Sequence, residues 1–99
     1  MAELAIHSLQ KYQTMVKLHP DDPDAHFGLG LAYEEQGNLA DAIRSLEQVT
    51  RIAPAYARAY LHRGFLFARN TELGGALDEW QKAFDLDPHL DNLFTDPST

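Results

Sequence analysis

Residues 26–38 read HFGLGLAYEEQGN, with glycines at positions 28, 30 and 37. Glycine pairs cradle phosphates when they lie between a strand and a helix, and within helices they mark close helix contacts. Ala25, Leu29, Ala32 and Tyr33 stand at i, i+4, i+7 and i+8, which is one face of a helix. No strand pattern precedes them, and the third glycine of a dinucleotide-binding loop is missing. The stretch therefore predicts a helix that ends near Gly37, and not a phosphate loop.

This pattern recurs with a period of 34 residues, since prolines occur at positions 20, 54 and 88. Matched positions keep their size class, as in Gly30 and Gly64, in Ser8, Ala42 and Ala76, and in Tyr12, Leu46 and Trp80. A period of this length indicates a chain built from stacked supersecondary units. Each unit should bury its apolar face against the next one.

Within each unit the apolar spacing predicts two helices joined by a short turn. After the break at Gly37, apolar residues at helical spacing resume at Leu39 and continue to Val49. Pro54 closes this second helical region, because proline lacks a backbone donor and restricts the residue before it. Gly30 and Ala42 should lie where the two helices cross, since a small side chain lets the backbones approach.

These residues resemble the tetratricopeptide repeat, whose pattern places aromatic, small and proline residues at such offsets. Residues 23–56 form the first full repeat, with Leu29, Gly30, Tyr33, Gly37, Ala42, Leu46 and Pro54. Residues 57–90 form the second, with Tyr60, Gly64, Phe67, Ala76, Trp80, Ala83 and Pro88. Residues 1–22 match only the second helix of a preceding repeat, and residues 91–99 form a short tail. The resemblance implies an all-α, right-handed solenoid of antiparallel helix-turn-helix repeats with about five helices.

Three positions depart from the family pattern. His26 replaces the usual first aromatic, and Thr71 replaces the turn glycine, so the second turn could differ in shape from the first. Arg63 stands where Leu29 stands in the repeat before. Its stem could pack while its head reaches water, or it could pair with an acid such as Asp78 or Glu79. The rarity of buried charge favours the first alternative.

The resemblance also implies that the first helices of the repeats line a concave groove that binds peptides or protein segments. By register, the groove is lined by Phe27, Gly28, Leu31, Glu34 and Glu35 in the first repeat, and by Arg58, Leu61, His62, Phe65 and Arg69 in the second. If Gly28 leaves a gap between Phe27 and Leu31, a partner's side chain would enter there. In the alternative interpretation, the apolar members pack on neighbouring helices or on the tail, and the charges form a solvated face.

The predicted function is therefore that of a protein-binding adaptor. The positions that carry Lys and Asn in chaperone-tail clamps hold Phe27, Leu31 and His62, so binding of a chaperone tail is not predicted. The alternative is a self-assembling structural module, forming a homodimer through apolar surface on the first helix or the last. The candidates there are Leu9, Tyr12 and Val16 on the first helix, and Leu77, Trp80 and Phe84 on the last. Leu90, Leu93 and Phe94 could fold back as a lid.

Composition narrows the classes of function. The 99 residues carry 15 acidic and 8 basic side chains, a net charge of −7, which opposes non-specific binding to nucleic acid and to anionic lipid. There is no cysteine, and the five histidines form no metal-binding motif. No nucleophile motif is present either, so we expect no catalysis, cofactor or metal. A signal-peptide pattern and long apolar runs are missing, which predicts a cytoplasmic protein without membrane insertion.

Overall fold

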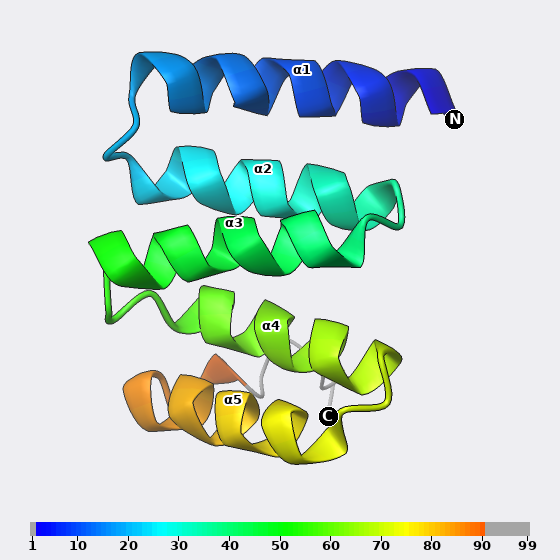
Figure 1. The fold of residues 1–99 in the computed structure, drawn as a ribbon. Coiled ribbons are helices and arrows are strands. Elements are labelled where there is room, and N and C mark those ends of the chain that lie inside the picture. Colours follow the sequence, from blue (N-terminus) through cyan, green and yellow to red (C-terminus); the bar gives the residue numbers. More distant parts are fainter. Residues whose placement is uncertain (1, 91–99) are drawn as a thin grey trace, which may run out of the picture. The chain divides into compact units, whose positions relative to one another are not determined.

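The computed structural model describes the backbone of residues 2–90 and the side chains of residues 7–90, and within this range the chain forms five α-helices and no strand. The helices are α1 (Ala2–Leu18), α2 (Pro23–Glu35), α3 (Leu39–Ile52), α4 (Ala57–Arg69) and α5 (Leu73–Leu86) (Figure 1). The predicted all-α fold is thereby confirmed. Two compact units can be separated, one within residues 1–54 and one within residues 55–99. They are described in turn.

In the first unit, α2 packs against α1 on one side and against α3 on the other (Figure 1). Asp22 caps α2, because its side chain accepts a hydrogen bond from the amide of Asp24, and Pro23 occupies the first turn, where no donor is lost. His26, in the position of the first family aromatic, is buried and donates from Nε2 to the carbonyl oxygen of Pro20 at 2.8 Å. This bond ties α2 to the loop that leads out of α1.

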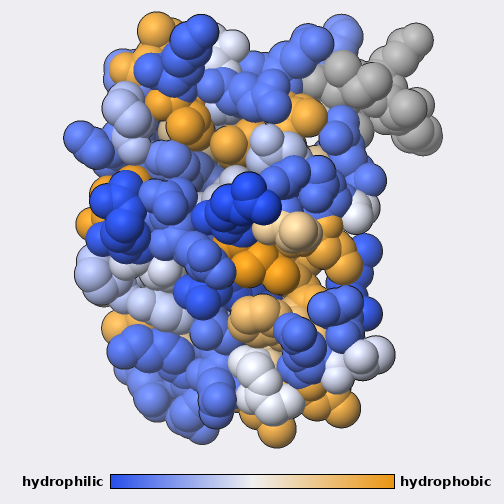
Figure 2. Space-filling model, viewed as in Figure 1, coloured by the Kyte–Doolittle hydropathy of each residue, from blue (hydrophilic) through white to orange (hydrophobic). Residues whose placement is uncertain are grey.

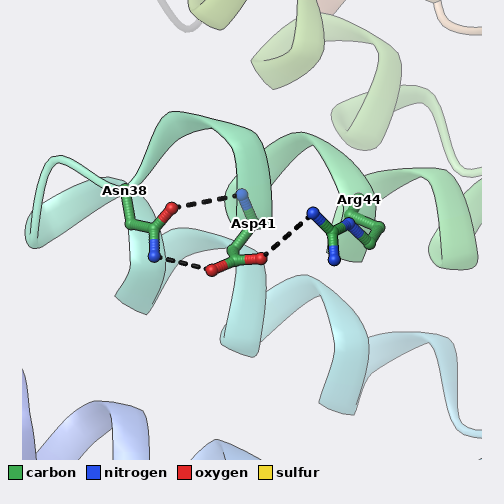
Figure 3. A network of polar contacts seen from close by, with 3 residues as sticks. All are labelled: Asn38, Asp41 and Arg44. Carbon is green, nitrogen blue, oxygen red and sulfur yellow. Dashed lines mark hydrogen bonds and ion pairs between the residues drawn. The ribbon is translucent and has the colours of Figure 1, made fainter.

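The start of α3 carries the network of polar contacts shown in Figure 3. Asn38 accepts from the backbone amide of Asp41 at 3.3 Å and donates to its carboxylate at 2.6 Å. Arg44, one turn further on, lies 3.4 Å from the other carboxylate oxygen. The carboxylate is thus placed in the first turn, where it also interacts favourably with the positive end of the helix dipole. The break in the helical pattern at residues 37–38 is therefore the place where α3 begins, with Asn38 as its N-terminal cap.

The close approach of α2 and α3 depends on Gly30. A methyl group at this position would lie 3.1 Å from Leu46 and 3.4 Å from the backbone oxygen of Ala42. Ala42, Leu46 and Val49 are completely buried, so the predicted crossing of small residues is present. The core of this unit therefore includes Ala42 and Leu46, which belong to the matched positions of the 34-residue repeat.

The second unit consists of α4 and α5, which run antiparallel to each other (Figure 1). Thr71 adopts φ 62°, in the left-handed region, as Gly37 does with φ 77° in the first turn. The two turns also share their hydrogen bonds, since Asn38 donates to Tyr33 at 3.0 Å and Glu72 donates to Phe67 at 2.8 Å. The expectation that replacement of the glycine changes the second turn is therefore wrong.

Candidate partner-binding site

The contact between Gly64 and Trp80 positions the side chains of the candidate site. Trp80 projects from α5 onto α4, where its indole lies so close to Gly64 that a methyl group there would overlap the ring. The indole Nε1–H is buried and finds no hydrogen-bond acceptor among the described side chains of residues 7–90 or the backbone of residues 2–90. Close packing, rather than a polar contact, therefore holds the ring in place.

An apolar hollow of about 210 Å³ opens beside this contact. It is lined by Leu61 and Phe65 from α4 and by Trp80 and Phe84 from α5. The rings of Phe65 and Trp80 meet edge to face, with centroids 5.7 Å apart and an interplanar angle of 64°. Aromatic pairs favour this arrangement, so the walls of the hollow support each other.

Leu90 completes the base of this region. Leu61 is 3% exposed and Leu90 is 4% exposed, and together with Ala83 they form a buried cluster against which the aromatic side chains pack. Leu61 was expected to be exposed in a groove, but it belongs to the core of the second unit. Leu61 therefore packs on the neighbouring helix α5 and on Leu90 of the same repeat, as in the alternative interpretation of packing within the chain. Leu93 and Phe94 lie outside the described residues.

Arg63 forms an ion pair across the helix pair. Its Nε lies 3.2 Å from Glu79 of α5, and the side chains are only 16% and 18% exposed. The guanidinium also lies 5.9 Å from the centre of the Tyr60 ring, and Lys82 approaches the same ring at 5.9 Å. The expected arrangement, with the charge extended into water, is therefore wrong, and the alternative of pairing with Glu79 is correct. Two charges that are mostly shielded from water are compatible with the fold because each neutralises the other.

The predicted groove residues of the first unit differ in their surroundings. Phe27, Leu31 and Glu34 are partly buried on α2, and Glu35 is exposed. Gly28 is buried because the ring of Tyr12 packs directly against it from α1. A methyl group at Gly28 would overlap that ring. The gap that the sequence suggested beside Gly28 is therefore filled from within the chain.

In the second unit, the structure brings some of the predicted residues together and leaves others apart. Leu61 and Phe65 share the hollow, and His62 meets Phe65 edge to face with centroids 6.1 Å apart. Arg58 and Arg69 are exposed near opposite ends of α4. The apolar and aromatic members therefore lie close together, and the two arginines lie apart from each other along the helix.

Trp80 and Phe84 line the hollow although the sequence pattern did not place them in the groove. The pattern assigned them to an outer face of the last helix, because α5 is the second helix of its repeat and the groove is expected along the first helices. Their spacing of i, i+4 was a usable signal, since it places both on one face of α5 next to Ala83. Which face of α4 they meet depends on how the two helices pack.

The hollow has the chemistry of an apolar binding site. All four lining side chains are hydrophobic, and a recess of this kind suits a hydrophobic side chain of a ligand. Among the side chains of residues 7–90, no group of three or more His, Asp or Glu is arranged to hold a metal ion. No helix in the same range is both long and apolar enough to span a bilayer. On the face seen in Figure 2, hydrophobic side chains interrupt a mostly hydrophilic surface.

A second hollow, of about 270 Å³, lies in the first unit and has a more polar lining. Its polar members are His26, Tyr33, Asp41, Arg44, Ser45 and Gln48. Because His26 and Asp41 already bind Pro20 and Asn38, these polar groups are engaged in stabilising the helices. The apolar hollow of the second unit is the stronger candidate for a partner site.

Comparison with known protein families and sequences identifies similar proteins. The model of the tetratricopeptide repeat family matches residues 7–57 and 32–90. Hsp70-Hsp90 organizing protein 2 from Arabidopsis thaliana is 22% identical over 86 residues, which cover 87% of this chain and 15% of that protein. The chain therefore spans a small part of the length of this curated relative.

Solved structures show the same fold. YrrB, described as a TPR protein with an unusual peptide-binding site, is 28% identical, with a TM-score of 0.84 over 90% of this chain and 46% of that one. The type III secretion chaperone SycD of Yersinia enterocolitica, solved in complex with a peptide of the translocator YopD, has a TM-score of 0.86 at 20% identity. That match covers 94% of this chain and 73% of SycD.

Proposed function

Because the chain belongs to the tetratricopeptide repeat family, we propose that it is a module that binds a peptide or helical segment of a partner protein. The observation that carries this proposal is the apolar hollow between α4 and α5. Leu61 and Phe65 stand at positions that the family pattern assigns to the ligand-binding face. A recess that these two residues line together with the aromatic rings of Trp80 and Phe84 is suited to anchor a hydrophobic side chain.

Similar proteins provide precedents for this activity. YrrB has a peptide-binding site, and SycD was solved with a bound peptide. Both precedents concern short segments of protein rather than small molecules. They support the view that this chain, with the same fold, binds a ligand of the same class.

The first unit supplies further proposed contacts. Phe27 and Leu31 lie on α2 at the repeat positions of Leu61 and Phe65. Glu34 and Glu35 on α2 and Arg58 and Arg69 on α4 are the charges that we propose orient the partner, since charge complementarity contributes mainly to specificity and association rate. Gly28 contributes through its packing on Tyr12, which positions α2, and His62 through its edge contact with Phe65.

The expected affinity is moderate. Burial of one large apolar side chain contributes about 1.5–3 kcal/mol, and a segment that binds the apolar members of the proposed site would gain from a few such groups. Ordering of the segment offsets much of this gain. We expect dissociation constants of about a micromolar.

A peptide library selected on the whole chain provides the test. Binding of the selected peptides is then measured by fluorescence anisotropy with the wild type, with Phe27→Ala/Phe65→Ala, and with Leu18→Ala as a matched control. Leu18 is 68% exposed on α1 and outside the proposed site. We expect the double variant to lose at least about tenfold in affinity, or roughly 1.4 kcal/mol, and the control to retain it.

Circular dichroism of each variant shows whether the helices persist. Unchanged affinity in a folded double variant would overturn the proposed site. A selection that yields no peptide able to bind the wild type above background would contradict the proposed function itself.

A further inference from the structure

A stripe of apolar side chains runs along the whole of α5. Leu73, Leu77, Trp80 and Phe84 follow each other at i, i+4, i+7 and i+11, so they share one face of the helix. Trp80 and Phe84 line the hollow, whereas Leu73 and Leu77 are each 63% exposed. The stripe is therefore about 16 Å long, and it continues the hollow toward the N-terminus of α5 by about 10 Å. Exposed leucines in line with an apolar recess are typical of a binding surface.

The equivalent stripe on α1 shows what kind of element such a surface accepts. Leu9, Tyr12 and Val16 precede Leu77, Trp80 and Phe84 by two repeat lengths. On α1 all three residues are partly buried, and the neighbouring helix α2 packs against this helix. In this molecule, therefore, the stripe of one such helix is covered by another helix.

The residue of α2 that contacts Tyr12 of α1 is small. Gly28 of α2 receives the ring of Tyr12, and a methyl group there would overlap it. Ala25 and Ala32, which lie at i−3 and i+4 from Gly28, are also buried. A helix that presents small residues can approach a stripe of large side chains closely, because the large groups fill the space that the small ones leave.

The charges beside the α5 stripe indicate the chemistry of the covering helix. Asp78 and Asp85 are exposed on one flank of the stripe, about 100° around the helix from it. Lys82 lies on the far side of α5 and approaches Tyr60. The flank is therefore acidic. Among the side chains of residues 7–90, the only hydrogen bond to the Asp85 carboxylate comes from Gln81, which carries no charge.

A second copy of α5 fits this surface poorly. In a two-fold symmetric pair of antiparallel α5 helices, the same flank of each helix faces the other. With the two-fold axis near residues 81–82, Asp78 would lie near Asp85 of the other copy, and like charges that face each other across an interface are destabilising. The acidic flank therefore favours a partner of opposite charge.

We propose that the α5 stripe binds an amphipathic helix of a partner protein, with small and apolar residues on its contact face and lysine or arginine along the edge that meets Asp78 and Asp85. This rests on the proposed peptide-binding function and narrows it. The bound segment is a basic helix that lies along α5 and inserts a side chain into the hollow.

Two synthetic helical peptides test the charge requirement. Each has about four turns with the same leucine and alanine face, and the flank carries lysine in one and glutamate in the other. Fluorescence anisotropy with the whole chain should show at least about tenfold tighter binding of the lysine peptide, and the difference should shrink as salt is added. In Asp78→Lys/Asp85→Lys the preference should reverse. Equal binding of the two peptides, or binding of neither, overturns the proposal.

A second pair of variants tests the path of the helix. Leu77→Asp should weaken the lysine peptide by about tenfold or more, and Leu18→Asp, an equally exposed control on α1, should not. If Phe65→Ala abolishes binding and Leu77→Asp leaves it intact, the chain remains a peptide-binding module but the α5 path is wrong. A light-scattering mass of two chains that returns to one in Leu77→Asp assigns the stripe to self-association and also overturns the proposal.

Discussion

Thr71 shows how strongly the ends of two helices determine the turn between them. A β-branched residue at positive φ is uncommon, because its side chain crowds the backbone in that conformation. Thr71 nevertheless adopts φ 62°, with the hydrogen-bond pattern that the glycine turn uses. Its hydroxyl donates to the carbonyl oxygen of Asn70 at 2.6 Å, which offsets part of the strain. The turn shape therefore follows from the packing of α4 on α5 rather than from the residue type.

Replacement of this residue should stabilise the protein. Thr71→Gly relieves about 1–2 kcal/mol of left-handed strain, and it adds about 0.4–1 kcal/mol of chain entropy to the unfolded state. We expect a net gain of about 0.5–1 kcal/mol in the free energy of unfolding, measured by urea denaturation. The reciprocal change, Gly37→Thr, should lower stability by at least the same amount. A loss of stability in Thr71→Gly would show that the turn is not strained.

At the scale of the helices, the Arg63–Glu79 pair joins α4 and α5 at a position where the first repeat uses Leu29. The two side chains lie 3.2 Å apart and are mostly shielded from water. Removal of one partner leaves the other charge in a poorly hydrated place, whereas removal of both does not. The pair should therefore behave as a coupled unit between the two helices.

A double-mutant cycle measures this coupling. Arg63→Met and Glu79→Met should each destabilise the protein, and the double variant should lose less than the sum of the two by about 1 kcal/mol. Urea denaturation of the four proteins provides the values. Additive losses would show that the ion pair contributes nothing beyond the packing of the two stems.

At the scale of the whole molecule, charge decides which partners are excluded. The chain carries 15 acidic and 8 basic residues, and its net charge is −7. Long-range attraction therefore favours basic partners and opposes polyanions. This bias agrees in sign with the acidic flank of α5, so the same preference holds for the molecule and for the proposed surface.

We expect no binding to a random-sequence DNA duplex. Non-specific association depends on the release of counterions by basic side chains, and typical dissociation constants are about 1–100 µM for proteins that have a basic surface. An anisotropy titration at about 0.15 M salt should therefore stay flat up to about 100 µM protein, with a basic DNA-binding domain as the positive control. Saturable micromolar binding would contradict this charge argument.

The sequence by itself determined the helices, their order and the small residues at the crossings. These features repeat every 34 residues and depend on local spacing, so the amino-acid pattern alone identifies Gly30, Ala42 and the helix break next to Asn38. The residues that contact Gly28, Leu61 and Arg63 do not follow from that pattern. The Tyr12 ring fills the space beside Gly28, Leu61 packs with Leu90, and Arg63 pairs with Glu79.

The difference has a physical reason. Helical periodicity determines which face a side chain occupies, because that depends only on rotation along one helix. The neighbour that a side chain meets depends on how two helices approach, and close packing settles this through the size and shape of many side chains together. Only the tertiary structure therefore decided that Trp80 and Phe84 meet Leu61 and Phe65 in one hollow, and that Leu73 and Leu77 remain exposed beside it.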